Sequence, residues 1–150
     1  TRIVVSFENN VFGAVVLLES SLAVVVAETN NKLKSALFHG ETNGLNAFFA
    51  KARQVKTNQL IFLSTHEPCS MFLFAIKWAG FDKVYYFFDY ENLRDDFKIL
   101  HDLKIFKELF NIEPGCYNKE NTFSSCGSII ESSENLFLRS SDSTKQVVKA

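Results

Sequence analysis

The segment Gln59–Ala79, QLIFLSTHEPCSMFLFAIKWA, contains two apolar runs separated by a short polar turn. The first run, Gln59–Ser64, has the length and the apolar pattern of a buried strand. The second run, Cys69–Ala79, is apolar on nearly all sides and is followed by Gly80, so it predicts a buried helix that ends at this glycine. A strand followed by a helix is the crossover unit that parallel sheets require. The segment therefore predicts an α/β fold.

Strand and helix patterns continue on both sides of this segment. Two short β-branched runs upstream surround a Glu-Ser-Ser turn and predict a hairpin, and two further segments carry apolar residues at helical spacing. The expected elements are strands at Val11–Leu18, Leu22–Glu28 and Lys83–Phe88, and helices at His39–Arg53 and His101–Asn111. Because strands joined by helices need crossovers, this order predicts a three-layer α/β/α fold with a mixed, mostly parallel sheet.

The length and the composition of the chain fit a globular protein. Of the 150 residues, 47% are hydrophobic, which excludes a disordered chain, and three cysteines are too few for a secreted disulfide scaffold. The net charge of −1, from 16 basic and 17 acidic residues, provides no broad basic surface for nucleic acid. No apolar segment approaches the roughly 20 residues that a membrane span needs. We therefore expect a cytoplasmic protein without a membrane partner.

The strand and helix patterns fade beyond Pro114, where serine residues become frequent. In this region only the pair Ile129 and Ile130 and the run Leu136–Leu138 have side chains suited to packing in a core. We therefore expect an α/β domain at residues 1–113 and a C-terminal extension at residues 114–150, which docks partly on the domain and frays at its end.

The starts of the two crossover helices carry side chains suited to metal and proton chemistry. His39 and Glu41 lie at the start of the first helix, and Cys69 lies at the start of the second. Imidazole and thiolate groups are zinc ligands, and a helix N-terminus stabilises a thiolate. Parallel crossovers bring both helix starts to one edge of the sheet, where α/β folds bind ligands. His39 and Cys69 are therefore candidate metal ligands, and Glu41 is a candidate for proton transfer.

Together these motifs resemble the zinc-dependent cytidine/deoxycytidylate deaminase superfamily. Its signature is H-x-E followed by P-C-x-x-C, and the chain has HGETNGLNAF at His39–Phe48 and STHEPCSMF at Ser64–Phe72. The form T-x-E-P-C is typical of the branch that contains base, nucleoside and tRNA adenosine deaminases. The resemblance runs from about Asn9 to about Asn111. The family usually has a full helix before the first strand, and Thr1–Asn10 looks like the last turns of that helix.

The resemblance implies the cytidine-deaminase-like fold, zinc as the cofactor, and a role for each residue at a motif position. These are the zinc ligands His39 and Cys69, the proton shuttle Glu41, and the substrate-binding residues Phe12 and Asn30 (or its neighbour Asn31). The implied substrate is a small-molecule base, nucleoside or nucleotide, and the implied assembly is a homodimer. The near-neutral chain makes tRNA a less favoured partner, because phosphate-rich partners usually require a basic patch.

One position departs from the signature. The second cysteine of P-C-x-x-C falls at position 72, which is Phe72 in this chain. Phenylalanine has no lone pair to donate to zinc and is bulkier than cysteine, so only His39 and Cys69 are left as ligands. Cys116 and Cys126 lie in loop-like sequence and are weak candidates to replace the missing ligand.

The sequence is therefore compatible with three functions. The first is hydrolytic deamination of a base, nucleoside or nucleotide by a zinc-activated water. The second is a catalytically silent, metal-poor fold that acts as a binding or interaction module, and Phe72 favours this function directly. The third is an altered enzyme in which another ligand or another metal completes the site.

Overall fold

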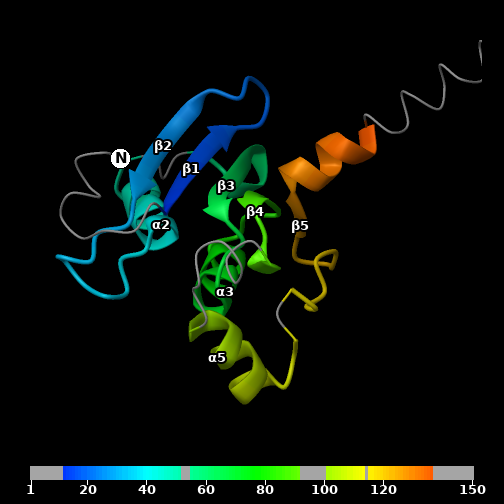
Figure 1. Ribbon diagram of the computed structural model, residues 1–150. Helices are drawn as coiled ribbons and strands as arrows, with labels where there is room; N and C mark the ends of the chain where they lie inside the picture. Colours follow the sequence, from blue (N-terminus) through cyan, green and yellow to red (C-terminus); the bar gives the residue numbers. More distant parts are fainter. Residues whose placement is uncertain (1–11, 52–54, 92–100, 114, 137–150) are drawn as a thin grey trace, which may run out of the picture.

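The computed structural model describes residues 12–51, 55–91, 101–113 and 115–136 and shows an α/β fold (Figure 1). The strands are β1 (Gly13–Leu18), β2 (Val24–Thr29), β3 (Leu60–His66), β4 (Lys83–Phe88) and β5 (Ser125–Ser128). The helices are α2 (Gly40–Lys51), α3 (Ser70–Trp78) and α5 (His101–Phe110), with a short 3-10 helix at Thr57–Gln59 and a helical segment at residues 129–136. The helix turns expected at Thr1–Asn10 lie outside the described residues.

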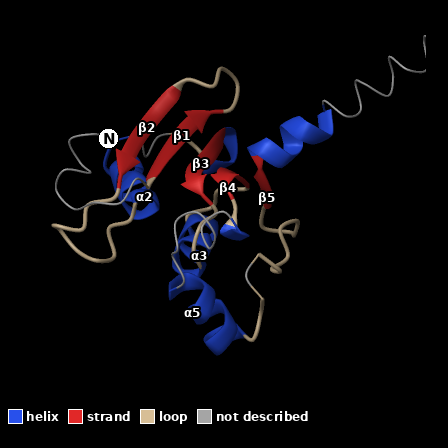
Figure 2. Cartoon of the chain, in the orientation of Figure 1, coloured by secondary structure: helices blue, strands red, loops and turns tan. Residues whose placement is uncertain are grey.

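Within the described residues the sheet has five strands in the order β2-β1-β3-β4-β5 (Figure 2). Strand β1 is antiparallel to β2 and to β3, whereas β3, β4 and β5 are parallel to one another. All of these strands except β1 therefore run in the same direction, which confirms the prediction of a mixed, mostly parallel sheet. The predicted hairpin is formed by β1 and β2, and its turn contains Leu22 with a positive φ of 56°.

Phenylalanine side chains fill the space between the sheet and the helices α2 and α3. The ring of Phe81 lies 5.4 Å from that of Phe62 on β3 and 5.5 Å from that of Phe48 on α2. Phe72 of α3 is part of the same core, and all four side chains are at most 2% exposed. Aromatic pairs at these separations add to the stabilisation that apolar burial provides. The phenylalanines therefore pack α2 and α3 against the sheet.

Gly40, the first residue of α2, lies directly against Gly13, the first residue of β1. A Cβ atom at Gly40 would lie 2.8 Å from the Cα of Gly13, closer than real Cβ contacts. Gly40→Ala should therefore lower the free energy of unfolding by about 1–3 kcal/mol, because the helix start must move away from the strand. Urea unfolding measures this loss. Gly127→Ala is the control, since its Cβ would have nothing within 4 Å, and equal midpoints for both variants would contradict the close approach.

Strand β5 is an element that the sequence analysis missed. It lies in the region expected to be an extension, and it pairs in parallel with β4, with Cys126 opposite Val84. The sequence SCGS has no apolar alternation, so nothing local marks it as a strand. The sheet therefore includes a segment from beyond Pro114. Among the described residues, no helix has both the length and the hydropathy that crossing a membrane requires.

Candidate functional site

The candidate residues gather at one edge of the sheet. Because β1 and β3 are antiparallel, with Ala14 opposite Ser64, the start of β1 lies beside the end of β3. Helix α2 begins against the start of β1, and α3 follows directly after β3. Glu41 of α2 thereby comes within hydrogen-bond distance of Ser64, whose hydroxyl group donates to the carboxylate at 3.0 Å. The starts of both helices therefore meet at this edge.

Glu41 is buried, with 6% of its surface exposed. Burial raises the pKa of its carboxyl group from 4.5 to about 7, and the hydrogen bond from Ser64 opposes this rise. The negative charge of Asp102 adds to the rise. A carboxyl group that titrates near neutral pH can both accept and donate a proton, which is the requirement for general acid–base chemistry.

The raised pKa of Glu41 makes the stability of the fold depend on pH. The unfolded chain loses this proton near pH 4.5, whereas the folded chain keeps it up to about 7. Between these values the folded state binds more protons, so the free energy of unfolding falls as pH rises. Glu41→Gln should remove this fall. From about pH 5 to about pH 8, the free energy of unfolding of the unmodified protein, measured in urea, should fall by up to about 3 kcal/mol relative to that of Glu41→Gln. A difference between the two proteins that is constant with pH would contradict the raised pKa.

Cys69 is the N-cap residue of α3 and is buried, with 8% of its surface exposed. Burial raises the pKa of its thiol group to about 12, and the negative charge of Asp102 adds to the rise. The backbone N–H groups of Phe72 and Met71 act in the opposite direction but do not cancel the effect of burial. In the absence of a metal ion, Cys69 is therefore a neutral thiol at physiological pH, not a reactive thiolate.

The Phe72 side chain packs against His39, one of the two candidate metal ligands. Its ring centre is 4.8 Å from that of His39, and its side chain is 2% exposed. Within the part of the chain that the structure describes, no three His, Cys, Asp or Glu side chains are placed to hold a metal ion. Cys126 lies near Tyr117, with its sulfur 3.6 Å from the Tyr117 hydroxyl, and Cys116 is exposed. The residues present do not fit a three-ligand zinc site.

Phe12 and Asn30 lie side by side at the same edge. The backbone N–H of Asn30 donates to the carbonyl of Phe12 at 3.1 Å, and the Asn30 side chain is almost fully buried, with 1% exposed. The ring of Phe12 packs edge-on against that of His66, with the centres 4.5 Å apart. Asn31 has a different role, because its side-chain oxygen accepts a hydrogen bond from the backbone N–H of Lys34 within a turn. Of the two asparagines, Asn30 is therefore the one whose side chain is buried next to Phe12.

Asp102 is a residue of the site edge that the sequence analysis missed. It lies in the first turn of α5. Burial lowers the pKa of His39, and the negative charge of Asp102 acts in the opposite direction. Burial in turn raises the pKa of Asp102, and His39 lowers it. In the sequence, an acidic residue in the first turn of a helix is explained by its favourable interaction with the helix dipole. Nothing local indicates that α5 brings it toward α2.

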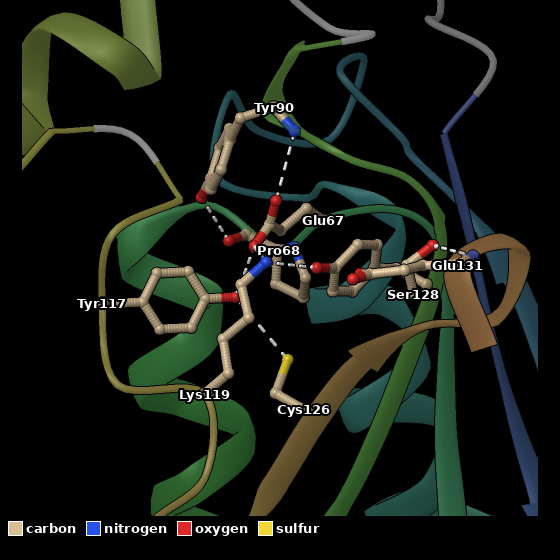
Figure 3. Close-up of polar contacts among 9 residues, drawn as sticks. Glu67, Pro68, Tyr90, Tyr117, Lys119, Cys126, Ser128 and Glu131 are labelled. Atoms are coloured by element: carbon tan, nitrogen blue, oxygen red, sulfur yellow. Dashed lines mark hydrogen bonds and ion pairs between the residues drawn. The ribbon is translucent and has the colours of Figure 1, made fainter. Parts of the chain in front are cut away.

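Glu67 anchors the turn that carries Cys69, and it too was missed. Its side chain is 1% exposed and accepts hydrogen bonds from the backbone N–H of Tyr90 at 3.1 Å and from the hydroxyl of Tyr117 at 2.7 Å (Figure 3). The ammonium group of Lys119 lies 3.1 Å from the same carboxylate. The hydroxyl of Tyr90 also donates to the carbonyl of Pro68 at 2.5 Å. The network fixes the end of β3 to the segments around residues 90 and 117–119.

A comparison with protein families shows to which family the chain belongs. A model of the cytidine and deoxycytidylate deaminase zinc-binding region matches residues 3–88 of the chain. The chain belongs to this deaminase family. The matched range contains both helix starts, and it also contains Phe72. Among curated proteins, no sequence matches the chain.

Several solved structures of deaminases have the same fold. Guanine deaminase from Nitrosomonas europaea superposes with a TM-score of 0.60 at 16% identity, over 85% of this chain and 69% of that chain. A tRNA:A34 deaminase gives 0.57 at 20% identity, over 85% and 88%. The protein NE0047 in complex with 2,6-diaminopurine gives 0.53 at 20% identity, over 61% of this chain and 52% of that chain, so this match spans about half of NE0047. These matches confirm the cytidine-deaminase-like fold.

Proposed function

We propose that this chain is a catalytically silent member of its family, which keeps the deaminase fold as a binding module for a small-molecule base or nucleoside. The observation that carries the proposal is the position of Phe72. Its ring packs against His39 and lies in the core where the family signature has a third metal ligand. Two ligands are fewer than the three protein ligands that catalytic zinc sites use.

The chemistry left to the other site residues suits binding better than hydrolysis. In this family zinc supplies the activated water that hydrolytic deamination requires. Without it, Glu41 has no activated water from which to take a proton, and the neutral thiol of Cys69 is a poor nucleophile. What the residues of this chain still supply is a buried carboxyl group, a buried amide and an aromatic ring, contributed by Glu41, Asn30 and Phe12.

These three groups suit recognition of a flat heterocycle. An amide and a carboxyl group bind the polar edge of a base through hydrogen bonds, and an aromatic ring packs on its face. NE0047, which has this fold, binds 2,6-diaminopurine. For this chain we propose a ligand of the same class, in preference to tRNA, because the net charge is −1. A cytoplasmic homodimer is part of the proposal.

Zinc-dependent deamination is the second candidate function. The observation that favours it is the hydrogen bond between Glu41 and Ser64, together with the pKa of about 7 for the Glu41 carboxyl group. A carboxyl group with this pKa at a helix start is what a proton shuttle requires. His39 and Cys69 at the same edge would be the two remaining metal ligands.

Two measurements on the purified protein separate the candidates. Ammonia release should stay at the buffer rate with free bases, nucleosides and nucleotides, with and without added zinc. Calorimetric titration should show saturable binding of 2,6-diaminopurine, weakened at least about tenfold, or about 1.4 kcal/mol, by Asn30→Ala and unchanged by Asn31→Ala. Release of ammonia that a chelator abolishes would establish the hydrolase instead. Absence of saturable binding would overturn the proposed ligand class.

A further inference from the structure

Thr65, near the end of β3, makes two hydrogen bonds through a single hydroxyl group. Its Oγ1 atom accepts from the backbone N–H of Gly13 at 3.0 Å. The same atom lies 2.9 Å from Nδ1 of His66. The backbone ladder between β1 and β3 ends one pair earlier, at Ala14 and Ser64. The Thr65 side chain therefore continues the connection between the two strands beyond that pair, at the edge where the candidate residues gather.

The N–H of Gly13 belongs to the peptide group between Phe12 and Gly13, which is held from both sides. The carbonyl oxygen of this group, that of Phe12, accepts from the backbone N–H of Asn30 at 3.1 Å. Its N–H points in the opposite direction and donates to Thr65. Because the peptide group is planar, the two bonds fix the backbone at Phe12 and link it to Asn30. Phe12 and Asn30 are two of the residues in the proposed binding site.

The second hydrogen bond of Thr65 acts on the ring of Phe12. Since Oγ1 accepts from Gly13, its one proton is available for donation to Nδ1 of His66. Burial lowers the pKa of His66 to about 4, so at neutral pH its ring is uncharged and one ring nitrogen is an acceptor. The His66 side chain is buried, and its ring is the one on which Phe12 packs edge-on. A hydrogen bond donated by Thr65 therefore fixes the imidazole that supports the Phe12 ring.

We propose that Thr65 is a positioning residue, which holds the Phe12 ring and the backbone at Asn30 in the arrangement that receives a base. Thr65 acts through these two residues and does not itself contact the ligand. The inference rests on the proposed function, because it concerns the same site. Binding sites depend on such supporting hydrogen bonds, since a contact residue that is free to move is in the binding arrangement for only part of the time.

Calorimetric titration with 2,6-diaminopurine compares the unmodified protein with Thr65→Val and Thr65→Ser. Valine keeps the shape of the side chain without the hydroxyl group, whereas serine keeps the hydroxyl group. Thr65→Val should weaken binding about tenfold, because a hydrogen bond of ordinary strength no longer favours the binding arrangement. Thr65→Ser should stay within about twofold of the unmodified protein. The control is Thr57→Val, which removes a hydroxyl group just before β3, at the other end of the strand, and should leave the affinity unchanged.

Nitrogen NMR of the His66 ring distinguishes positioning from a general loss of stability. Near neutral pH, Nδ1 of the unmodified protein and of Thr65→Ser should have the chemical shift of an unprotonated nitrogen that accepts a hydrogen bond. In Thr65→Val this signal should move to the shift of a nitrogen that accepts none. The amide proton of Gly13 should also exchange faster with solvent in Thr65→Val, since its acceptor is lost. Circular dichroism checks that each variant is folded.

Four outcomes would overturn the inference. Equal affinity of the unmodified protein and a folded Thr65→Val for 2,6-diaminopurine overturns it and leaves the proposed function standing. The same holds if Thr65→Ser loses as much affinity as Thr65→Val, because the hydroxyl group is then not the cause. It also holds if Nδ1 of His66 carries the ring proton in the unmodified protein, a result that requires no variant. Absence of saturable binding by the unmodified protein overturns the proposed ligand class and, with it, this role of Thr65.

Discussion

Phe72→Cys should convert the chain into a zinc-binding protein. The new thiol joins His39 and Cys69 and supplies the three protein ligands that catalytic zinc sites of this kind use. Elemental analysis after dialysis against zinc and removal of free metal should give about one zinc ion per chain for the variant, and far less for the unmodified protein. Because Phe72 is 2% exposed in the core, the metal-free variant should also lose about 3 kcal/mol of unfolding free energy.

The matched control for this prediction is Phe72→Leu. It shortens the same buried side chain but adds no donor atom, so it should lose stability without gaining zinc. Zinc should raise the unfolding midpoint of Phe72→Cys alone, because a metal that binds only the folded state stabilises it by mass action. A Phe72→Cys variant that is folded and free of zinc would show that His39 and Cys69 are not oriented toward one site.

Lys119→Met should be the most destabilising change in the network around Glu67. It removes the cation 3.1 Å from a carboxylate whose side chain is 1% exposed, and it leaves that negative charge buried. Loss of one partner of a buried pair costs roughly 3–5 kcal/mol. The hydrogen bonds from Tyr90 and Tyr117 remain, so we expect a value near about 3 kcal/mol in urea unfolding.

Two further variants define what this loss means. Lys107→Met breaks the ion pair between Lys107 and Glu113, in which both side chains are more than half exposed, and should cost less than about 1 kcal/mol. Adding Glu67→Gln to Lys119→Met should restore part of the stability, because it removes the uncompensated charge. A cost for Lys119→Met no larger than that for Lys107→Met would contradict a buried pair at Glu67.

The sequence predicted those elements whose patterns are local. The apolar runs of β3 and α3 and the helical stripe of α2 are visible in single segments, because burial of one face dictates the spacing of apolar residues. Strand β5 has no such pattern. Its four residues, Ser125–Ser128, are a strand because β4 offers a free edge to pair with, which is a property of the whole sheet.

For the candidate site, too, the sequence predicted only the residues that local patterns mark. His39, Glu41 and Cys69 follow from two helix starts, which α/β topology brings to one edge. Asp102 and the partners of Glu67 come from distant segments, α5 and the loop around residues 117–119. Their contribution depends on tertiary packing, which leaves no periodic signal in the sequence. Spacing predicts that Phe72 stands at the position of a ligand, and the structure adds that its ring packs against His39 in the core.

The zinc content of the unmodified protein tests the central claim most directly. The protein should be produced with zinc in the medium, purified without chelator, and analysed for metal by mass spectrometry against protein concentration from amino-acid analysis. Because the proposal leaves only His39 and Cys69 as ligands, we predict far less than one zinc ion per chain. A value close to one zinc ion per chain that survives gel filtration would contradict the silent-fold account.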